Sequence, residues 1–156
     1  MSGSLRSAGG HDSGAALAAL QNALAAEQAA SYGYGIVGAR LPQRSASQSQ
    51  AATDWVTHLR TADQLTQLIN ARGATPTPAA VAYQLPFPVN SAAQAKALAA
   101  TLEDRVAAAY IGLVAVTEVR LRSFGAEQVR AAALRAEAWR GSTQAFPGLP
   151  PTSLRR

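Results

Sequence analysis

The sequence predicts an all-α protein, folded as a four-helix bundle with one long crossover between the second and third helices. Alanine supplies 37 of the 156 residues, and alanine is the strongest helix former. Glycine and proline gather at a few places, which leaves long uninterrupted segments between them. Within those segments apolar residues recur in alternating steps of three and four, the spacing of one helix face.

The first helix is expected to follow a disordered tail of residues 1–13. Ser13, before Gly14, can cap its first turn, and Pro42 ends it. Between these two points one stripe runs along a single face without interruption, as expected for a long helix packed on others. The stripe consists of Leu17, Leu20, Leu24, Glu27, Ser31, Tyr34, Gly38 and Leu41.

The second helix is expected over about residues 50–72, where the same spacing recurs. Gly73 follows the last turn, and glycine favours the left-handed backbone that ends many helices. The stripe of this helix consists of Ala51, Trp55, His58, Ala62, Leu65 and Ile69.

Residues 73–90 contain four prolines and cannot form an interior helix or a central strand. A helix of the length expected for the second one spans roughly 35 Å, whereas 18 extended residues reach roughly 60 Å. The segment is therefore long enough to cross the bundle and start the third helix beside the start of the second. One such crossover is the topology of the ferritin-like bundle. An up-down-up-down bundle with a long loop is the alternative.

The third helix is expected to begin after a cap at Asn90 or Ser91 and to run to about Ser123. Gly125 interrupts the helical pattern, so the fourth helix is expected over about residues 126–143. The prolines of residues 146–156 indicate an irregular C-terminal tail. The chain is thus expected to be one bundle domain, residues 14–145, between two tails.

The charge of the chain gives little support for nucleic-acid binding. The net charge is +5, from thirteen arginines and one lysine against nine acidic residues, and part of the excess lies in the two expected tails. Nucleic-acid binding would require basic residues gathered on one face. The first thirteen residues lack the apolar core of a signal peptide, and no segment has the roughly 18 apolar residues of a membrane span. We therefore expect a cytoplasmic protein with no membrane or nucleic-acid partner.

Charged residues interrupt the apolar stripes at a few positions. Glu27, His58 and Glu103 each stand where an ordinary bundle would place an apolar residue, and Glu137 is a weaker fourth case. An unpaired carboxylate inside a protein costs several kcal/mol, so each of these groups needs a partner. Because all four lie near the middle of separate helices, we expect them to converge at one level of the bundle.

The first interpretation is a buried polar network that holds no metal, in a bundle that is not catalytic. In this network His58 and an arginine, Arg135 or Arg140, would neutralise the buried carboxylates, and tyrosine hydroxyls would supply the remaining hydrogen bonds. The expected members are Glu27, His58, Glu103, Arg135, Tyr34 and Tyr110.

The second interpretation is a dinuclear iron or manganese site of an oxidase or iron-handling protein, with Glu27, His58, Glu103 and Glu137 as ligands. Such sites take one glutamate from each of two helices and a Glu-x-x-His pair from each of the other two. Here the two pairs would read Trp55-x-x-His58 and Glu137-x-x-Arg140, which is one carboxylate and one histidine short. Asp54 is an imperfect substitute for the missing carboxylate.

Several segments together resemble an actinobacterial ferritin-like family with no assigned function. They are AALAAEQAASYGYGIVGARL, HLRTADQL, VAYQLPFPVN, LAATLEDRVAAAY and AEAWRGSTQAFPGLP, and the resemblance covers about residues 15–149. It implies a ferritin-like four-helix bundle and a homo-oligomer. The metal motif of the wider superfamily would fall on Glu27, His58, Glu103 and Glu137, but Trp55 and Arg140 depart from it.

Three glycines lie close together in the first helix, at Gly33, Gly35 and Gly38. Each costs roughly 1 kcal/mol of helix stability relative to alanine. Close approach of a second helix, within the bundle or across a subunit interface, would offset that cost. We therefore expect a homodimer; a cofactor pocket at these glycines is the alternative.

Overall fold

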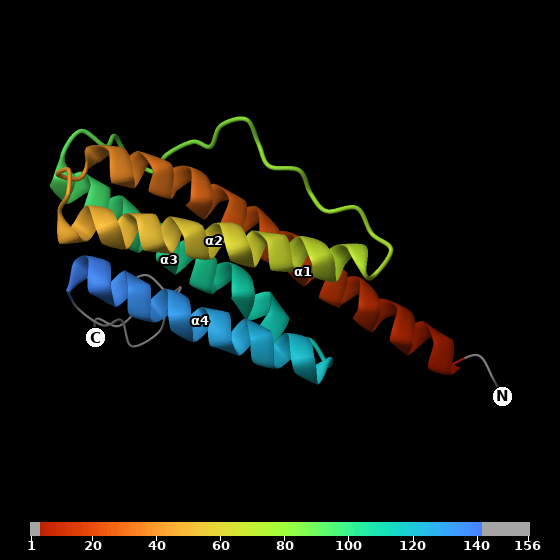
Figure 1. The fold of residues 1–156 in the computed structure, drawn as a ribbon. Helices are drawn as coiled ribbons and strands as arrows, with labels where there is room; N and C mark the ends of the chain where they lie inside the picture. The colour runs from red at the N-terminus through yellow and green to blue at the C-terminus, as the bar shows by residue number, and fades with distance from the viewer. Residues whose placement is uncertain (1–3, 142–156) are drawn as a thin grey trace.

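The computed structural model describes residues 4–141, and their side chains from residue 13 onward. Its four helices are α1 (Ser4–Arg40), α2 (Ala46–Asn70), α3 (Ala92–Val114) and α4 (Val119–Arg140), arranged as a bundle (Figure 1). The all-α four-helix prediction is therefore confirmed. No helix in the described part of the chain combines the length and the hydropathy of a membrane span. The expected tail at residues 146–156 lies outside the described residues.

The predicted crossover is present, because α2 and α3 run in the same direction and the segment between them returns along the bundle (Figure 1). The up-down-up-down alternative is therefore wrong. The returning segment is fixed to the outer face of α1 by two glutamine side chains. Gln21 donates to the carbonyl of Thr75 at 2.8 Å and accepts from the amide of Thr77 at 2.8 Å, and Gln28 donates to the carbonyl of Thr77 at 2.9 Å.

Apolar residues hold the second half of the crossover against the bundle. The Tyr83 ring lies 5.5 Å from the Tyr32 ring of α1, centroid to centroid. Leu85 and Phe87 pack against buried residues, and Val89 is itself buried. The proline-rich segment therefore covers one side of the bundle.

The starts of α1 and α2 differ from those expected. α1 begins at Ser4, so residues 4–13 are helical, and this part of α1 extends past the other helices (Figure 1). Without helices beside it, it needs no apolar stripe, and the sequence therefore gave no sign of it. α2 begins at Ala46 because the Ser45 hydroxyl accepts a hydrogen bond from the Gln48 amide at 3.1 Å. Its expected stop at Gly73 is supported by the left-handed backbone there, with φ of 70°.

The break between α3 and α4 comes earlier than expected, because α3 ends nine residues and α4 begins seven residues before the expected positions. The predicted cap at Ser91 is confirmed, since its hydroxyl accepts from the Gln94 amide at 3.2 Å. α3 ends at Val114, however, and α4 starts at Val119. Val116 is buried in the short connection, which anchors the turn. The prediction that α3 runs to Ser123 is therefore wrong.

Gly125 lies inside α4 and marks a helix contact, not a helix end. A Cβ atom added there would lie 2.7 Å from the Cβ of Leu113 and 3.2 Å from its carbonyl carbon. No side chain larger than hydrogen fits at that distance, so the glycine lets α3 and α4 approach closely. The expected interruption at Gly125 is wrong for this reason.

The interior is divided along the helix axes into three regions. A first apolar cluster includes Leu20, Leu24, Leu65, Ile69 and Leu113, and a second includes Val37, Leu41, Leu98, Leu102 and Trp139. Between the two clusters lie three buried residues that can carry a charge, Glu27 of α1, His58 of α2 and Glu103 of α3. Arg135 of α4 pairs with Glu103. We call these four residues the polar layer.

Candidate functional site

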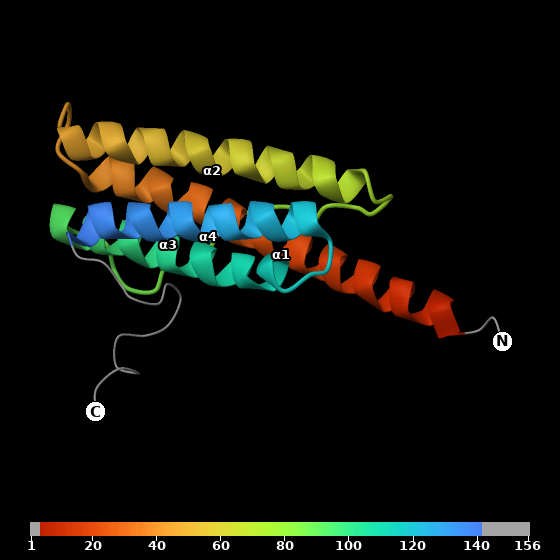
Figure 2. The ribbon, with the colours of Figure 1, turned by 90° about the horizontal axis from the view of Figure 1, so that it is seen from below.

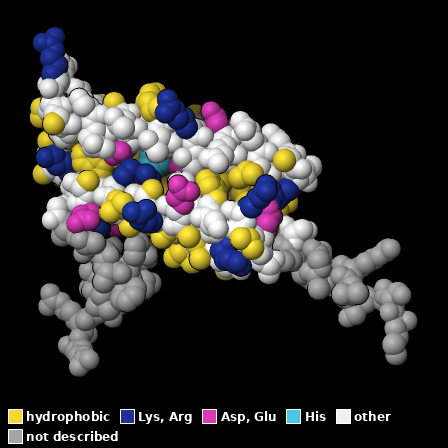
Figure 3. Space-filling view, turned by 60° about the horizontal axis from the view of Figure 1, so that its bottom comes forward, with side chains coloured by type: hydrophobic (Ala, Val, Ile, Leu, Met, Phe, Trp, Pro, Cys, Tyr) yellow, Lys and Arg dark blue, Asp and Glu magenta, His cyan; other side chains and the backbone are white. Residues whose placement is uncertain are grey.

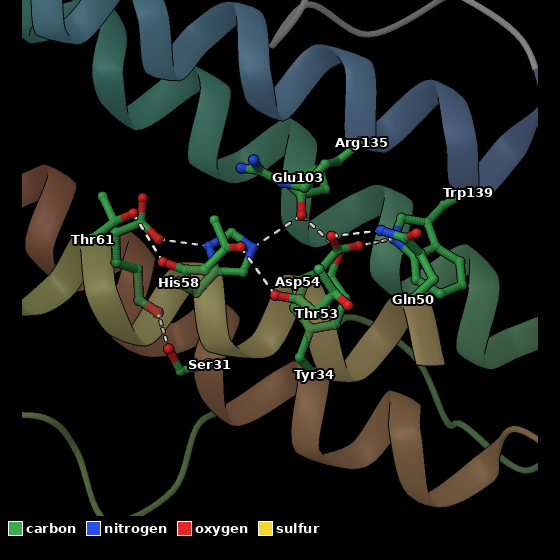
Figure 4. Close-up of polar contacts among 12 residues, drawn as sticks. Ser31, Tyr34, Gln50, Thr53, Asp54, His58, Thr61, Glu103, Arg135 and Trp139 are labelled. Atoms are coloured by element: carbon green, nitrogen blue, oxygen red, sulfur yellow. Dashed lines mark hydrogen bonds and ion pairs between the residues drawn. The ribbon is translucent and has the colours of Figure 1, made fainter. Parts of the chain in front are cut away.

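The polar layer brings together one charged side chain from each helix of the bundle. Glu27, His58 and Glu103 are each at most 1% exposed, and the side chain of Arg135 is 16% exposed. The three buried residues are those that interrupt the apolar stripes of α1, α2 and α3. Figure 4 labels three of the four, with His58 and Glu103 linked by a contact and Arg135 beside Glu103.

His58 lies between the two glutamates and contacts each with a different ring nitrogen. Its Nδ1 is 2.6 Å from Oε2 of Glu27, and its Nε2 is 2.9 Å from Oε1 of Glu103. An ionised carboxylate can only accept hydrogen bonds, so both ring nitrogens must carry a proton to satisfy both contacts. The geometry therefore favours an imidazolium that bridges α1 and α3 from α2.

The charges of the polar layer stabilise this protonation state. Burial alone would lower the pKa of His58, but the hydrogen bonds and charges of Glu103 and Glu27 outweigh it and raise the pKa to about 9. Burial opposes ionisation of Glu103 as well, yet its contacts with His58 and Arg135 hold its pKa below the usual value. Both groups are consequently charged at neutral pH.

Arg135 adds a second positive charge next to Glu103. Its Nε lies 3.0 Å from Oε2 of Glu103, which is the carboxylate oxygen that does not face His58. The attraction of Glu103 raises the pKa of Arg135 against the opposing effect of burial. His58 and Arg135 thus place two basic groups against the two carboxylates of the polar layer.

Each of the two glutamates also accepts a hydrogen bond from a tyrosine. The hydroxyl of Tyr34 donates to Oε1 of Glu103 at 2.6 Å, and that of Tyr110 donates to Oε1 of Glu27 at 2.7 Å. Burial and the neighbouring negative charges raise the pKa of both tyrosines, so they remain protonated donors. The structure thus brings together all six residues expected for the polar network.

A second carboxylate group, centred on Asp54, was not expected as a member of this network. Asp54 is 3% exposed and accepts hydrogen bonds from Nε1 of Trp139 at 2.9 Å and from Nε2 of Gln50 at 2.8 Å (Figure 4). The Tyr34 hydroxyl lies 3.4 Å away and joins Asp54 to Glu103. Burial raises the pKa of Asp54, although the bonds from Trp139 and Gln50 oppose that effect.

Helix spacing is the signal that would have found these residues. Asp54 lies four residues before His58 on α2, and Trp139 lies four residues after Arg135 on α4. Residues four apart lie on the same face of a helix. Once His58 and Arg135 face the interior, their neighbours one turn away must also face it.

The remaining residues of the expected metal motif lie elsewhere. Glu137 is half-buried and is two residues from Arg135, so it projects about 200° around the axis of α4. Arg140 forms an ion pair with Asp104 at the surface. Trp55 is 42% exposed.

As arranged, the polar layer does not fit a di-metal site. A histidine binds a metal through a ring nitrogen without a proton, whereas both ring nitrogens of His58 lie within hydrogen-bond distance of carboxylate oxygens. Arg135 also places a positive charge against Glu103. Among the described residues, no group of three or more histidine, aspartate or glutamate side chains is placed to hold one metal ion.

The three glycines of α1 have different surroundings. A Cβ added at Gly33 would lie 2.5 Å from Cδ1 of Leu102, so this glycine makes room for α3. Gly35 and Gly38 face open space. They line a groove of about 450 Å³ between α1 and α2, whose α2 side includes Ala52 and Trp55.

Comparison with known proteins identifies relatives of this chain. A conserved hypothetical protein from Mycobacterium tuberculosis, whose crystal structure is known, has 36% sequence identity to this chain. The two structures match with a TM-score of 0.78, over 82% of this chain and 96% of the other. No curated protein matches the chain. The sequence pattern of a domain family of unknown function, DUF4439, matches residues 19–151. The chain therefore belongs to the DUF4439 family.

Proposed function

We propose that this protein is a ferritin-like bundle that works without a metal and without catalysis. In this proposal the polar layer occupies the level at which a di-metal centre would lie in a ferritin-like protein, and it fixes how the four helices align. One observation carries the proposal: the two ring nitrogens of His58 lie within hydrogen-bond distance of carboxylates from two other helices. Buried ion pairs of this kind specify alignment more than they add stability.

The charge balance supports the same conclusion. Two carboxylates at the centre of a bundle need two positive charges, and in a di-metal protein the metal ions supply them. Here His58 and Arg135 supply them from the chain itself. A metal ion would have to displace the proton of His58 and would be repelled by Arg135.

The proposal also covers the organism that the protein comes from, its place in the cell and its oligomeric state. The Mycobacterium tuberculosis relative supports an actinobacterial origin. We place the protein in the cytoplasm, with no nucleic-acid partner, and as a homodimer whose subunits meet at the groove beside Gly35 and Gly38. Light scattering at tens of micromolar should give the mass of a dimer, and a monomer there would contradict this assembly.

Metal analysis tests the central part of the proposal. Protein purified after growth with added iron and manganese should hold less than about a tenth of a metal equivalent per chain, because His58 and Arg135 already pair with the buried carboxylates. The same protein, stripped and then titrated with ferrous or manganous ion, should show no saturable binding.

The alternative is a di-metal oxidase or iron-handling protein, and the convergence of Glu27, His58 and Glu103 is the observation that favours it. About two metal equivalents per chain would establish it, provided that they are lost in Glu27→Ala. The matched control is Glu127→Ala, which removes an exposed carboxylate of α4. Metal lost equally in both variants would indicate surface binding.

A further inference from the structure

The first half of α2 is attached to the bundle differently from the second half. In the second half, Leu65 and Ile69 are fully buried in the first apolar cluster. In the first half, residues 46–61, the only buried apolar residue is Ala51, and the other buried side chains are polar: Asp54, His58 and Thr61. Its attachment to α3 and α4 therefore depends on hydrogen bonds and charges.

Those polar contacts bridge a wide separation between backbones. The backbones of α1 and α2, of α1 and α3, and of α3 and α4 approach closely, whereas α2 approaches α3 and α4 at isolated points at most. Figure 2 shows α2 at one edge of the bundle, apart from α3 and α4, yet Trp139 of α4 donates to Asp54 of α2 at 2.9 Å. The long side chains of His58, Glu103 and Trp139 span the distance.

Open space lies on both sides of the first half of α2. On one side is the groove of about 450 Å³ against α1, where Gly35 and Gly38 present no side chains. On the other is a cavity of about 310 Å³ lined by Gln50 and Ser47 of α2, Lys96 of α3 and Trp139 of α4. A histidine side chain is visible on the face drawn in Figure 3, beside acidic and basic side chains. On the face drawn in Figure 3, the polar layer therefore has only a thin cover of other side chains.

We propose that residues 46–61 form a lid, which opens away from α3 and α4 and exposes the buried carboxylates while the rest of the bundle stays folded. The contact between Asp54 and Trp139 fastens the lid to α4, and the contact between His58 and Glu103 fastens it to α3. The lid ends between Thr61 and Leu65 in this proposal, because the buried residues of α2 change there from polar to apolar. The lid does not depend on the proposed function, because it would serve a metal-free layer and a metal site equally.

Native-state hydrogen exchange with residue resolution tests the lid directly. Segments with few buried apolar contacts open at lower free energy than the whole fold. Amides of residues 46–61 should exchange through an opening that is insensitive to low denaturant, whereas those of residues 65–70 and 103–110 should exchange only by global unfolding. Exchange of all three segments in one denaturant-dependent step would overturn the proposal, and this result requires no variant.

Trp139→Phe should release the lid specifically, because it removes the indole N–H and keeps most of the ring. Loss of a hydrogen bond to a buried carboxylate should speed exchange of residues 46–61 about tenfold, with little change at residues 103–110. Thr53→Ala is the matched control, since its hydroxyl bonds only to the Ser49 carbonyl on the exposed side of α2. Equal acceleration in all helices of Trp139→Phe, or the same local effect in Thr53→Ala, would contradict the fastening.

Discussion

The polar layer and the first apolar cluster are neighbours in one bundle, yet they stabilise it in different ways. In the apolar cluster, Leu65 and Ile69 gain from leaving water and need no particular partner. In the polar layer, each group is stable only while its partners are present, because an unpaired buried charge is strongly unfavourable. The polar layer therefore contributes selectivity for one alignment of the helices, whereas the apolar cluster contributes stability.

The largest expected effect is from the loss of one charge in the polar layer. Glu103→Gln keeps the size of the side chain but leaves Arg135 unpaired and His58 with one carboxylate. It should lower the free energy of unfolding by about 4 kcal/mol, as measured by urea denaturation. The control is Asp104→Asn in the adjacent residue. A loss below 1 kcal/mol in Glu103→Gln would show that the layer is not a paired network.

A cavity in the apolar cluster should have an effect of similar size but a different character. Leu65→Ala should lower the free energy of unfolding by about 3.5 kcal/mol, because Leu65 is completely buried. The loss should be the same at pH 6.5 and at pH 9, since no charge is involved. Leu59→Ala, at a position that is 40% exposed on the same helix, serves as the control. A loss in Leu65→Ala that depends on pH would mean that cluster and layer are coupled.

The polar layer should make stability depend on pH. The pKa of His58 is about 9 in the fold against 6.5 when unperturbed, so its protonation stabilises the fold fully below pH 6.5. This contribution, about 3 kcal/mol, should disappear as the pH rises through 9. Urea denaturation across this range should show the decline in the wild type and a much flatter profile in His58→Gln. Stability that rises between pH 6.5 and 9 would contradict the assignment.

The smallest expected effect is from the ion pair between Asp104 and Arg140 at the surface. Both side chains are about a quarter exposed, and exposed pairs contribute roughly 0.5 kcal/mol. Asp104→Asn should therefore lower the free energy of unfolding by about this amount, and salt should remove the difference. A loss comparable to that of Glu103→Gln would show that position within the bundle does not distinguish the two carboxylates.

The polar layer could be predicted from the sequence because its members break strong apolar stripes. Glu27, His58 and Glu103 each occupy a position on a stripe of mostly apolar residues, so a charged residue there is informative. On α4 the same logic was misleading: Leu134 and Ala133 drew attention to Glu137, yet Leu134 is 54% exposed. The buried face of α4 is formed largely by Gly125, Ala132 and Ala136, and residues this small give almost no amphipathic signal.

The break between α3 and α4 was another feature that the sequence did not reveal. A glycine such as Gly125 often ends a helix. Here it instead allows α3 and α4 to pack closely, and the turn that joins these helices lies earlier in the chain. For Asp54, helix spacing from His58 indicates that it faces the interior, but its bond to Trp139, 85 residues away, does not follow from that spacing. Contacts between residues this far apart depend on the fold and cannot be obtained from local patterns.

The protonation state of His58 tests the account most directly. The chain has two histidines, so His11→Gln leaves His58 as the only imidazole in a nitrogen-15 NMR experiment. At neutral pH both ring nitrogens should carry protons, and they should titrate together near pH 9. A neutral ring at neutral pH, or a nitrogen bound to a metal, would contradict the claim that the chain itself neutralises its buried carboxylates.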